Sequence, residues 1–226
     1  MSIFLGVKKY EKTWYNGRAV AESIKTSTWR YSMRATPFED ASRIQIPKSE
    51  FRSMLSNILK NNRELGESIG EHEDTGDQIT SEMNRIRMLS TKERLDFYVE
   101  HRVDDQRLWY TKKAAYNKRM HKRWFIALIA AQFLALTSVL LRIAFPEWEL
   151  WPTDVFVVIA SFAIGWMQIK KFSELASAYS LTAQEIGIIR NQSEDIETES
   201  ALSEYTNNAE LAFSREHTQW AARQHT

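Results

Sequence analysis

The sequence predicts an all-α fold, a long antiparallel helical stalk that ends in a two-helix transmembrane hairpin, with N-terminal helices packed on the cytoplasmic stalk. Residues 48–145 and 153–226 contain no proline, the residue that most strongly breaks helices. Strand signals are poor, because alternating β-branched runs are few and only 7 of the 226 residues are glycine. Two uncharged apolar runs lie back to back in the C-terminal half and indicate the hairpin.

The chain divides into six consecutive segments on this basis. They are an N-terminal cytoplasmic helical segment (1–90), a stalk helix (91–123), a first transmembrane helix (124–145), an outer loop (146–150), a second transmembrane helix (151–169) and a C-terminal cytoplasmic helical arm (170–226).

Three helices are expected in the first segment, at residues 8–34, 49–65 and 79–89. Pro37 and Pro47 mark a loop between the first two, and the glycine-bearing residues 66–77 are the best flexible loop. Ser90 and Glu93 have the spacing of a capping box, so we expect the stalk helix to begin there.

The two apolar runs have the lengths that a membrane requires. Crossing a hydrocarbon layer of ~30 Å takes ~20 mostly apolar residues, so residues 124–145 qualify and residues 151–169 are marginal but adequate. The second span is that long only if Asp154 is tolerated near its outer end. The alternative is a pair of buried helices in a soluble bundle.

Charge is segregated on the two sides of these runs. Residues 146–154, which connect them, carry three acids and no base. Basic residues lie at the other ends, namely Lys112, Lys113, Lys118, Arg119, Lys122, Arg123, Lys170 and Lys171. The positive-inside rule therefore predicts cytoplasmic termini and an outer loop, and Trp124, Trp148, Trp151 and Trp166 lie where an aromatic belt is expected.

The C-terminal arm carries a heptad-like seam, typical of a helix packed along another. One row is Phe172, Tyr179 and Ile186, and a second is Leu175, Thr182, Ile189 and Ile196. Apolar residues from Leu202 onward continue the pattern after a phase shift.

Composition and motifs give little support to an enzyme. The chain has no cysteine, which excludes disulfides and thiolate chemistry, and its net charge of +1 does not suggest a nucleic-acid partner. It lacks a phosphate-binding glycine loop, a nucleophile elbow and paired histidines at zinc spacing, so we expect no catalytic residue and no cofactor. The acidic run around Glu71 and Asp74 is better explained as a solvated charge run than as a cation site.

Polar and small residues share one face of each membrane helix. In the second helix they are Asp154, Val158, Ser161, Gly165 and Gln168, and in the first they are Ala131, Ala135, Ser138 and Arg142. Such faces either permit close helix packing or line a water-filled path. For a pore, Ser161, Gly165 and Gln168 are the first candidates for its lining, followed by Ser138 and Arg142.

Two groups of charged residues are candidate polar sites. Arg142 and Asp154 are expected at comparable depth on opposite sides of the outer loop, where an isolated charge is costly, so they pair with each other, pair across subunits, or face water. Arg18, Glu22 and Lys25 share one face of the first helix. They form either a solvated ion-pair ladder or a buried cytoplasmic network.

Three blocks of residues resemble a known family. The first is Tyr15, Arg18, Ala21, Glu22, Lys25, Thr26, Trp29, Arg30, Tyr31, Pro37 and Phe38; the second is Arg94, Tyr98, Arg102, Gln106, Trp109, Tyr110, Lys113, Ala114 and Asn117; the third is Glu216, His217 and Trp220. Together with the hairpin they resemble the SLATT family, the SMODS- and SLOG-associating two-transmembrane effectors of bacteria.

The resemblance implies a function at the bacterial inner membrane. Such effectors oligomerise into pores that permeabilise the membrane in nucleotide-linked antiphage immunity. It also implies a nucleotide-sensing or nucleotide-synthesising partner protein, alongside membrane lipid and further copies of the chain. The competing interpretation is a non-conducting membrane scaffold, in which the hairpin only anchors a helical interaction platform.

Overall fold

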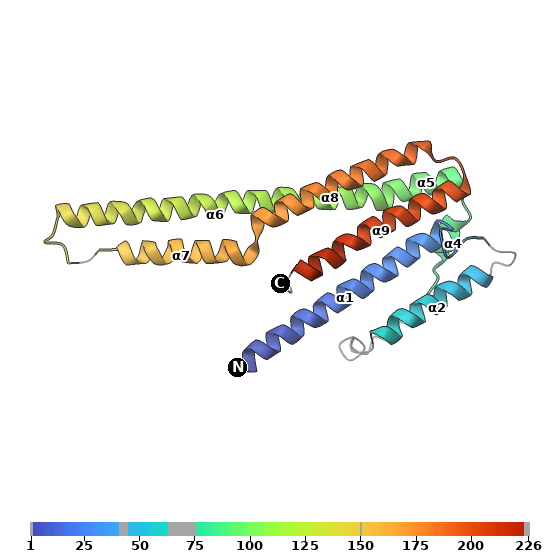
Figure 1. Cartoon of the computed structure of the whole chain (residues 1–226), viewed down its shortest axis with the longest axis horizontal. Helices are drawn as coiled ribbons and strands as arrows, with labels where there is room; N and C mark the ends of the chain where they lie inside the picture. The colour runs from blue at the N-terminus through green and yellow to red at the C-terminus, as the bar shows by residue number, and fades with distance from the viewer. Residues whose placement is uncertain (1, 41–44, 63–75, 150, 224–226) are drawn as a thin grey trace. The chain divides into compact units, whose positions relative to one another are not determined.

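A computed structural model describes residues 2–40, 45–62, 76–149 and 151–223, with side chains given for 16–40, 45–62, 76–149 and 151–214. These parts are α-helical with no strand, which confirms the all-α prediction. They form two compact units (Figure 1): residues 1–104 with 188–226, here called the terminal unit, and residues 105–187, called the hairpin unit. The predicted flexible loop, 66–77, lies mostly outside the described residues.

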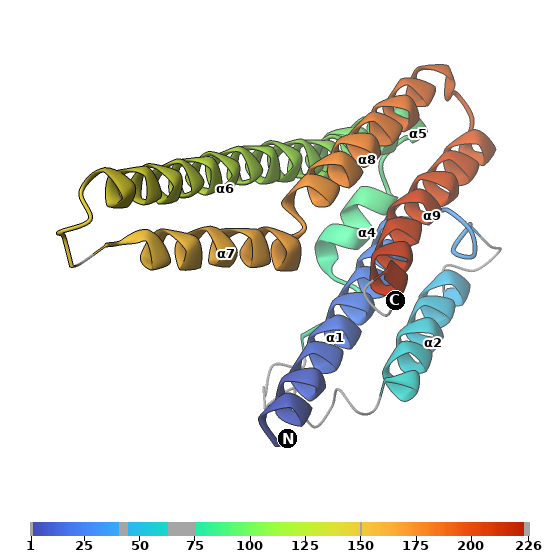
Figure 2. The ribbon, with the colours of Figure 1, turned by 60° about the vertical axis from the view of Figure 1, so that its left-hand side comes forward.

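The terminal unit contains helices from both ends of the chain. They are α1 (Ser2–Ser32), α2 (Gln45–Asn61), α4 (Ser81–Arg87), α5 (Thr91–Tyr98), a π-helix (Val99–Asp104), a short 3₁₀-helix (Ser193–Asp195) and α9 (Glu199–Arg223). Helix α1 packs against α2, α4 and α9, and it lies beside α9 in both views (Figure 1 and Figure 2). Trp29 of α1 also contacts Phe97 and Tyr98 of α5, so the N-terminal helices pack on the start of the stalk as predicted.

Local sequence explains several helix ends. Helix α1 ends where Arg34 adopts the left-handed conformation (φ 56°), which stops helix propagation. Helix α2 begins earlier than expected, at Gln45, because Pro47 is accommodated in the first turn, where a missing N–H costs no helical hydrogen bond. At the start of α5 the predicted capping box is present: Ser90 N–H donates to Glu93 Oε2 (2.9 Å), and the Ser90 side chain accepts from the Glu93 N–H.

An aromatic cluster packs between α1, α2 and α4 in the terminal unit. Tyr31, Phe38 and Phe51 are buried, with ring centroids 5.2 to 6.0 Å apart, and Ile79 and Met83 pack on them. Burial of side chains of this size stabilises the fold by roughly 1.5–3 kcal/mol each. This core fixes α1, α2 and α4 relative to one another.

The hairpin unit contains α6 (Asp105–Ala144), α7 (Thr153–Lys170) and the first part of α8 (Phe172–Gln192). The buried residues between α6 and α7 are small: Ala131 and Ser138 on one helix, Ala160 and Ala163 on the other. Small side chains let two helices approach closely, which is how transmembrane helices pack. Both helices are long and apolar enough to cross a membrane.

Their exposure separates a membrane hairpin from a soluble one. Only 11% of the apolar window on the first helix and 17% of that on the second is buried within the chain. The core helices of a soluble bundle would be mostly buried. The apolar surface of this hairpin therefore requires a non-aqueous environment.

Helix α8 returns along α6 after a break. Lys171 has a left-handed backbone (φ 47°) that separates α7 from α8. The predicted seam is partly confirmed: Phe172 and Ile186 are buried, and the Tyr179 ring lies 5.8 Å from that of Trp109. The seam ends at Gln192, so it does not extend to Ile196.

The C-terminal arm over 170–226 consists of two long helices, α8 and α9. The chain leaves α8 at Ser193–Asp195, and the extended backbone of Ile196 (φ −96°, ψ 111°) leads into α9 as a separate helix. Helix α9 packs on α1 instead of continuing the α8 seam. The predicted phase shift marks this turn.

Candidate functional site

The polar face of α7 points away from α6. Asp154 is nine residues, or about 900°, from the buried Ala163, which places it on the opposite side of the helix. Ser161 and Gln168 share that outward face and are exposed, and Val158 between them is 66% exposed. A Cβ added to Gly165 would meet no atom within 4 Å, so this glycine is not needed for packing inside the chain.

Ser138 belongs to a different surface from these residues. It is 7% exposed and lies among the small residues between α6 and α7. Within one chain it serves helix packing. The structure thus separates the candidate pore-lining residues into an outward set on α7 and an inner one on α6.

Arg142 and Asp154 form no ion pair with each other in the described structure, and both are exposed. The reason is an offset between the helices, because α6 continues past the start of α7 (Figure 1). Trp124 is level with Phe162 and Trp166, at ring distances of 6.2 and 6.1 Å. Arg142 lies 18 residues further along α6, level with the connection that precedes Thr153. The two charges therefore lie at different depths. Their positions beside the loop had suggested the same depth.

A buried charge cluster lies in the terminal unit. Glu210 of α9 and Arg102 of the π-helix are both 0% exposed. Arg102 donates to both carboxylate oxygens, from Nε (2.8 Å) and from Nη2 (2.7 Å), and its Nη2 also contacts Glu22 of α1 (2.9 Å). The same carboxylate accepts from the hydroxyls of Tyr98 (2.9 Å) and Thr26 (2.8 Å). This charge cluster joins four helices, α1, α5, the π-helix and α9.

Electrostatics keep Arg102 charged and Tyr98 protonated. Burial alone would lower the pKa of Arg102, but the hydrogen bonds and charges of Glu210 and Glu22 outweigh it and leave that pKa raised. Burial, together with the nearby Glu210 charge, raises the pKa of Tyr98 well above its usual value, so this phenol remains a donor. The Nη1 atom of Arg102 is buried without a hydrogen-bond partner in the described structure. A π-helix at this point is notable, because such segments are frequent at functional sites.

The charge cluster includes only some of the predicted network of Arg18, Glu22 and Lys25. Glu22 enters it through Arg102, whereas Lys25 is exposed. Sequence reasoning missed Glu210 as a site residue. Its signal was an acid on the same helical face as Thr206 and Phe213, where an unpaired charge could not be buried.

Two further buried arginines tie the terminal unit together. Arg94 donates to the Met33 carbonyl (2.8 Å) and pairs with Glu199 of α9. Arg87 donates to the Tyr31 carbonyl (2.6 Å) and pairs with Asp40 (2.8 Å). Partial burial opposes the charge of Glu199, but hydrogen bonds from Arg94 and Thr91 outweigh it and lower its pKa.

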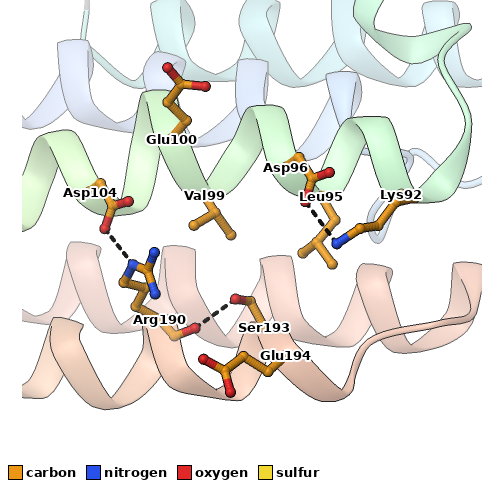
Figure 3. A pocket seen from close by; sticks show the side chains of 9 residues that line it. All are labelled: Lys92, Leu95, Asp96, Val99, Glu100, Asp104, Arg190, Ser193 and Glu194. Atoms are coloured by element: carbon orange, nitrogen blue, oxygen red, sulfur yellow. Dashed lines mark hydrogen bonds and ion pairs between the residues drawn. The ribbon is translucent and has the colours of Figure 1, made fainter.

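A cleft of about 340 Å³ opens between α5, the π-helix and the end of α8 within the terminal unit. Figure 3 shows two ion pairs across its lining, Lys92 with Asp96 and Arg190 with Asp104, each at 2.9 Å. Most of the charged side chains that line the cleft are therefore paired with one another. In the described ranges no group of three or more His, Asp or Glu is placed to hold a metal ion. The acidic run at Glu71 and Asp74 lies outside those ranges.

Comparisons with known proteins point to one family over almost the whole chain. Residues 98–220 match the family model described as SMODS and SLOG-associating 2TM effector domain 1. Residues 1–95 match the model of SMODS and SLOG-associating 2TM effector domain 3. No curated protein and no solved structure matches the chain. The two-transmembrane description agrees with the hairpin of α6 and α7.

Proposed function

We propose that this chain, which belongs to the SLATT family of SMODS- and SLOG-associating two-transmembrane effectors, assembles into a homo-oligomeric pore that permeabilises the bacterial inner membrane. The family is associated with SMODS and SLOG defence systems, and the chain is a membrane protein with two spans. Beyond the family and the two spans, we propose that the chain forms an oligomer, that this oligomer conducts, and that it lies in the bacterial inner membrane. No reaction is assigned to the chain.

The observation that supports the pore is the outward polar face of α7. Asp154 lies 12 residues before Trp166, or about 18 Å along the helix, which places it inside a hydrocarbon layer of about 30 Å. A charge exposed to lipid at that depth costs several kcal/mol. Ser161 and Gln168 continue the same exposed face. These groups therefore require water or another protein surface.

Several copies of the chain meet this requirement. One hairpin cannot enclose an aqueous path, since two helices have no interior between them. A ring of hairpins with the α7 faces turned inward places Ser161, Gly165 and Gln168 along a central path. Closed rotational symmetry is the usual form of such assemblies.

The orientation follows from charge. Basic residues such as Lys122 and Arg123 precede the first span, and Lys170 and Lys171 follow the second. The positive-inside rule places this side, with both termini, in the cytoplasm. There the terminal unit is accessible to a nucleotide-sensing or nucleotide-synthesising partner.

The buried charge cluster suits a controlling role. Arg102 lies within a helical stretch, Thr91–Ala144, that continues into the first span. A partner that displaced α9 would remove Glu210 from Arg102 and leave a buried charge unpaired, which is strongly unfavourable. The helix that bears Arg102 would then have to rearrange, and it leads directly into the membrane.

Substitution of the α7 face tests the pore in cells. Ser161→Leu with Gln168→Leu should abolish membrane depolarisation upon expression with the activating partner, while the oligomer persists. Thr137→Val is the matched control, because the Thr137 hydroxyl is already bonded to the Phe133 carbonyl (2.8 Å). Depolarisation that is unchanged in the double variant would contradict the pore.

The competing proposal is a non-conducting scaffold. It is favoured by the concentration of buried polar contacts in the terminal unit, away from the spans. In a scaffold, the substitutions at Ser161 and Gln168 would be silent, whereas in a pore they abolish depolarisation while the oligomer persists. These two substitutions therefore separate the two functions.

A further inference from the structure

A groove of about 550 Å³ runs along α8 beside α6 in the hairpin unit. Most of its polar lining comes from Lys118, His121, Ser173, Ser177, Ser180 and Gln184. The α8 residues recur at steps of four, three and four, so they form one face of that helix. Ala176 and Leu181 supply the apolar part of the wall.

The groove is rich in hydrogen-bond donors. The Lys118 ammonium offers only donors, and each serine hydroxyl can donate one hydrogen bond. None of the described residues that line the groove is acidic. A ligand that presents several acceptor oxygens and negative charge matches this lining best, and phosphate is the common biological group of that kind.

The position of the groove identifies the source of the phosphate. The rings of Trp124 and Trp166 lie 6.1 Å apart and mark one boundary of the hydrocarbon layer. His121 and Lys118 precede Trp124 by three and six residues, or about 4.5 and 9 Å, and Ser173 follows Trp166 by seven. The headgroup layer on each side is about 5–8 Å thick. The membrane end of the groove therefore lies at the level of lipid phosphates.

We propose that this groove binds the phosphate of an anionic membrane lipid. Lys118 pairs with the phosphate, while His121 and Ser173, at the membrane end of the groove, donate hydrogen bonds to its oxygens. The proposal depends on the two spans and not on conduction, so a failed pore would leave it standing.

Lipid retention by the purified full-length chain tests the site. Native mass spectrometry in detergent counts bound phosphatidylglycerol and phosphatidylcholine over a titration. We expect saturable binding of phosphatidylglycerol and little binding of phosphatidylcholine. Lys118→Gln with His121→Gln should weaken phosphatidylglycerol binding about tenfold or more, because charge-assisted hydrogen bonds are lost. Ser177→Leu fills the groove without changing charge and should also weaken it.

Lys122→Gln is the matched control. Lys122 is exposed and adjacent to His121 but does not line the groove, so this variant should bind like the natural chain. Equal losses in Lys122→Gln and in the groove variants would overturn the proposal in favour of diffuse attraction. Displacement by millimolar inorganic phosphate would reassign the groove to a soluble phosphate compound. Loss of the oligomer in Ser177→Leu, with lipid binding intact, would reassign it to a contact between copies.

Discussion

Arg102 and Glu210 lie 108 residues apart in sequence and meet in a bidentate ion pair that is wholly buried. The pair joins the π-helix of the stalk to α9, and Arg102 extends it to Glu22 of α1. Replacement of a buried pair by apolar groups can be neutral, but removal of one partner is strongly destabilising. The cluster therefore stabilises the packing of these helices, and displacement of the π-helix or α9 would leave a buried charge unpaired.

Glu210→Gln should lower the stability of the terminal unit. The amide cannot neutralise Arg102, so we expect a loss of about 3–5 kcal/mol in the free energy of unfolding. Chemical denaturation followed by circular dichroism measures the change. Glu204→Gln is the control, since Glu204 is exposed on the same helix, and it should stay within about 0.5 kcal/mol of the natural chain. Similar losses in both variants would show that the buried pair contributes no special stability.

Arg142 and Asp154 should contribute independently to assembly. They lie at different depths in the hairpin, and rotation of the copies about the membrane normal preserves that offset, so a direct pair between copies is not expected. We therefore expect the losses of assembly or ion flux in Asp154→Asn and Arg142→Gln to add in the double variant. A double variant that is less impaired than either single variant would reveal a direct pair and contradict the offset.

Gly165→Leu should disturb assembly without disturbing the chain. A Cβ added at this position would meet no atom of another part of its own chain within 4 Å, and leucine favours the helix more than glycine. If the α7 face is turned toward other copies, the bulk of leucine should reduce the fraction of oligomer seen by mass measurement in detergent. Gly165→Ala is the milder control. An unchanged oligomer with Gly165→Leu would place this face toward lipid.

Alkaline pH should destabilise the terminal unit through Tyr205. Burial raises the pKa of the Tyr205 phenol to about 12, whereas a tyrosine in the unfolded chain titrates near pH ~10. Between these values only the unfolded chain loses the proton, so the free energy of unfolding falls as pH rises. The difference in denaturation midpoint between about pH 9 and about pH 11 should be smaller in Tyr205→Phe than in the natural chain. Equal differences would show that Tyr205 does not contribute.

The local features of this fold could be predicted from the sequence. The apolar runs and the Ser90 and Glu93 capping box each depend on residues close together in the chain, and the predictions of two spans and of the helix start agree with the structure. Proline-free stretches likewise predicted the helices, with ends displaced by a few residues. Pro47 shows why ends are harder, because proline fits the first turn of a helix as well as a loop.

Features that join distant residues could not be read in the same way. Nothing near Glu210 indicates that its partners are Arg102 and Tyr98, more than 100 residues away. The offset of α6 and α7 was hidden too, since a short connection suggested that Arg142 and Asp154 lie at equal depth. Helical periodicity placed Ser138 and Ser161 on polar faces of their helices, but only packing shows that one is buried and the other is exposed.

Ion flux through the purified chain in liposomes tests the central claim most directly. Full-length protein, inserted as an oligomer and supplied with its activating partner, should release an ion gradient at a rate that Ser161→Leu with Gln168→Leu removes and Thr137→Val preserves. A well-inserted oligomer that never conducts, with or without the partner, would contradict the pore and leave the chain a membrane scaffold.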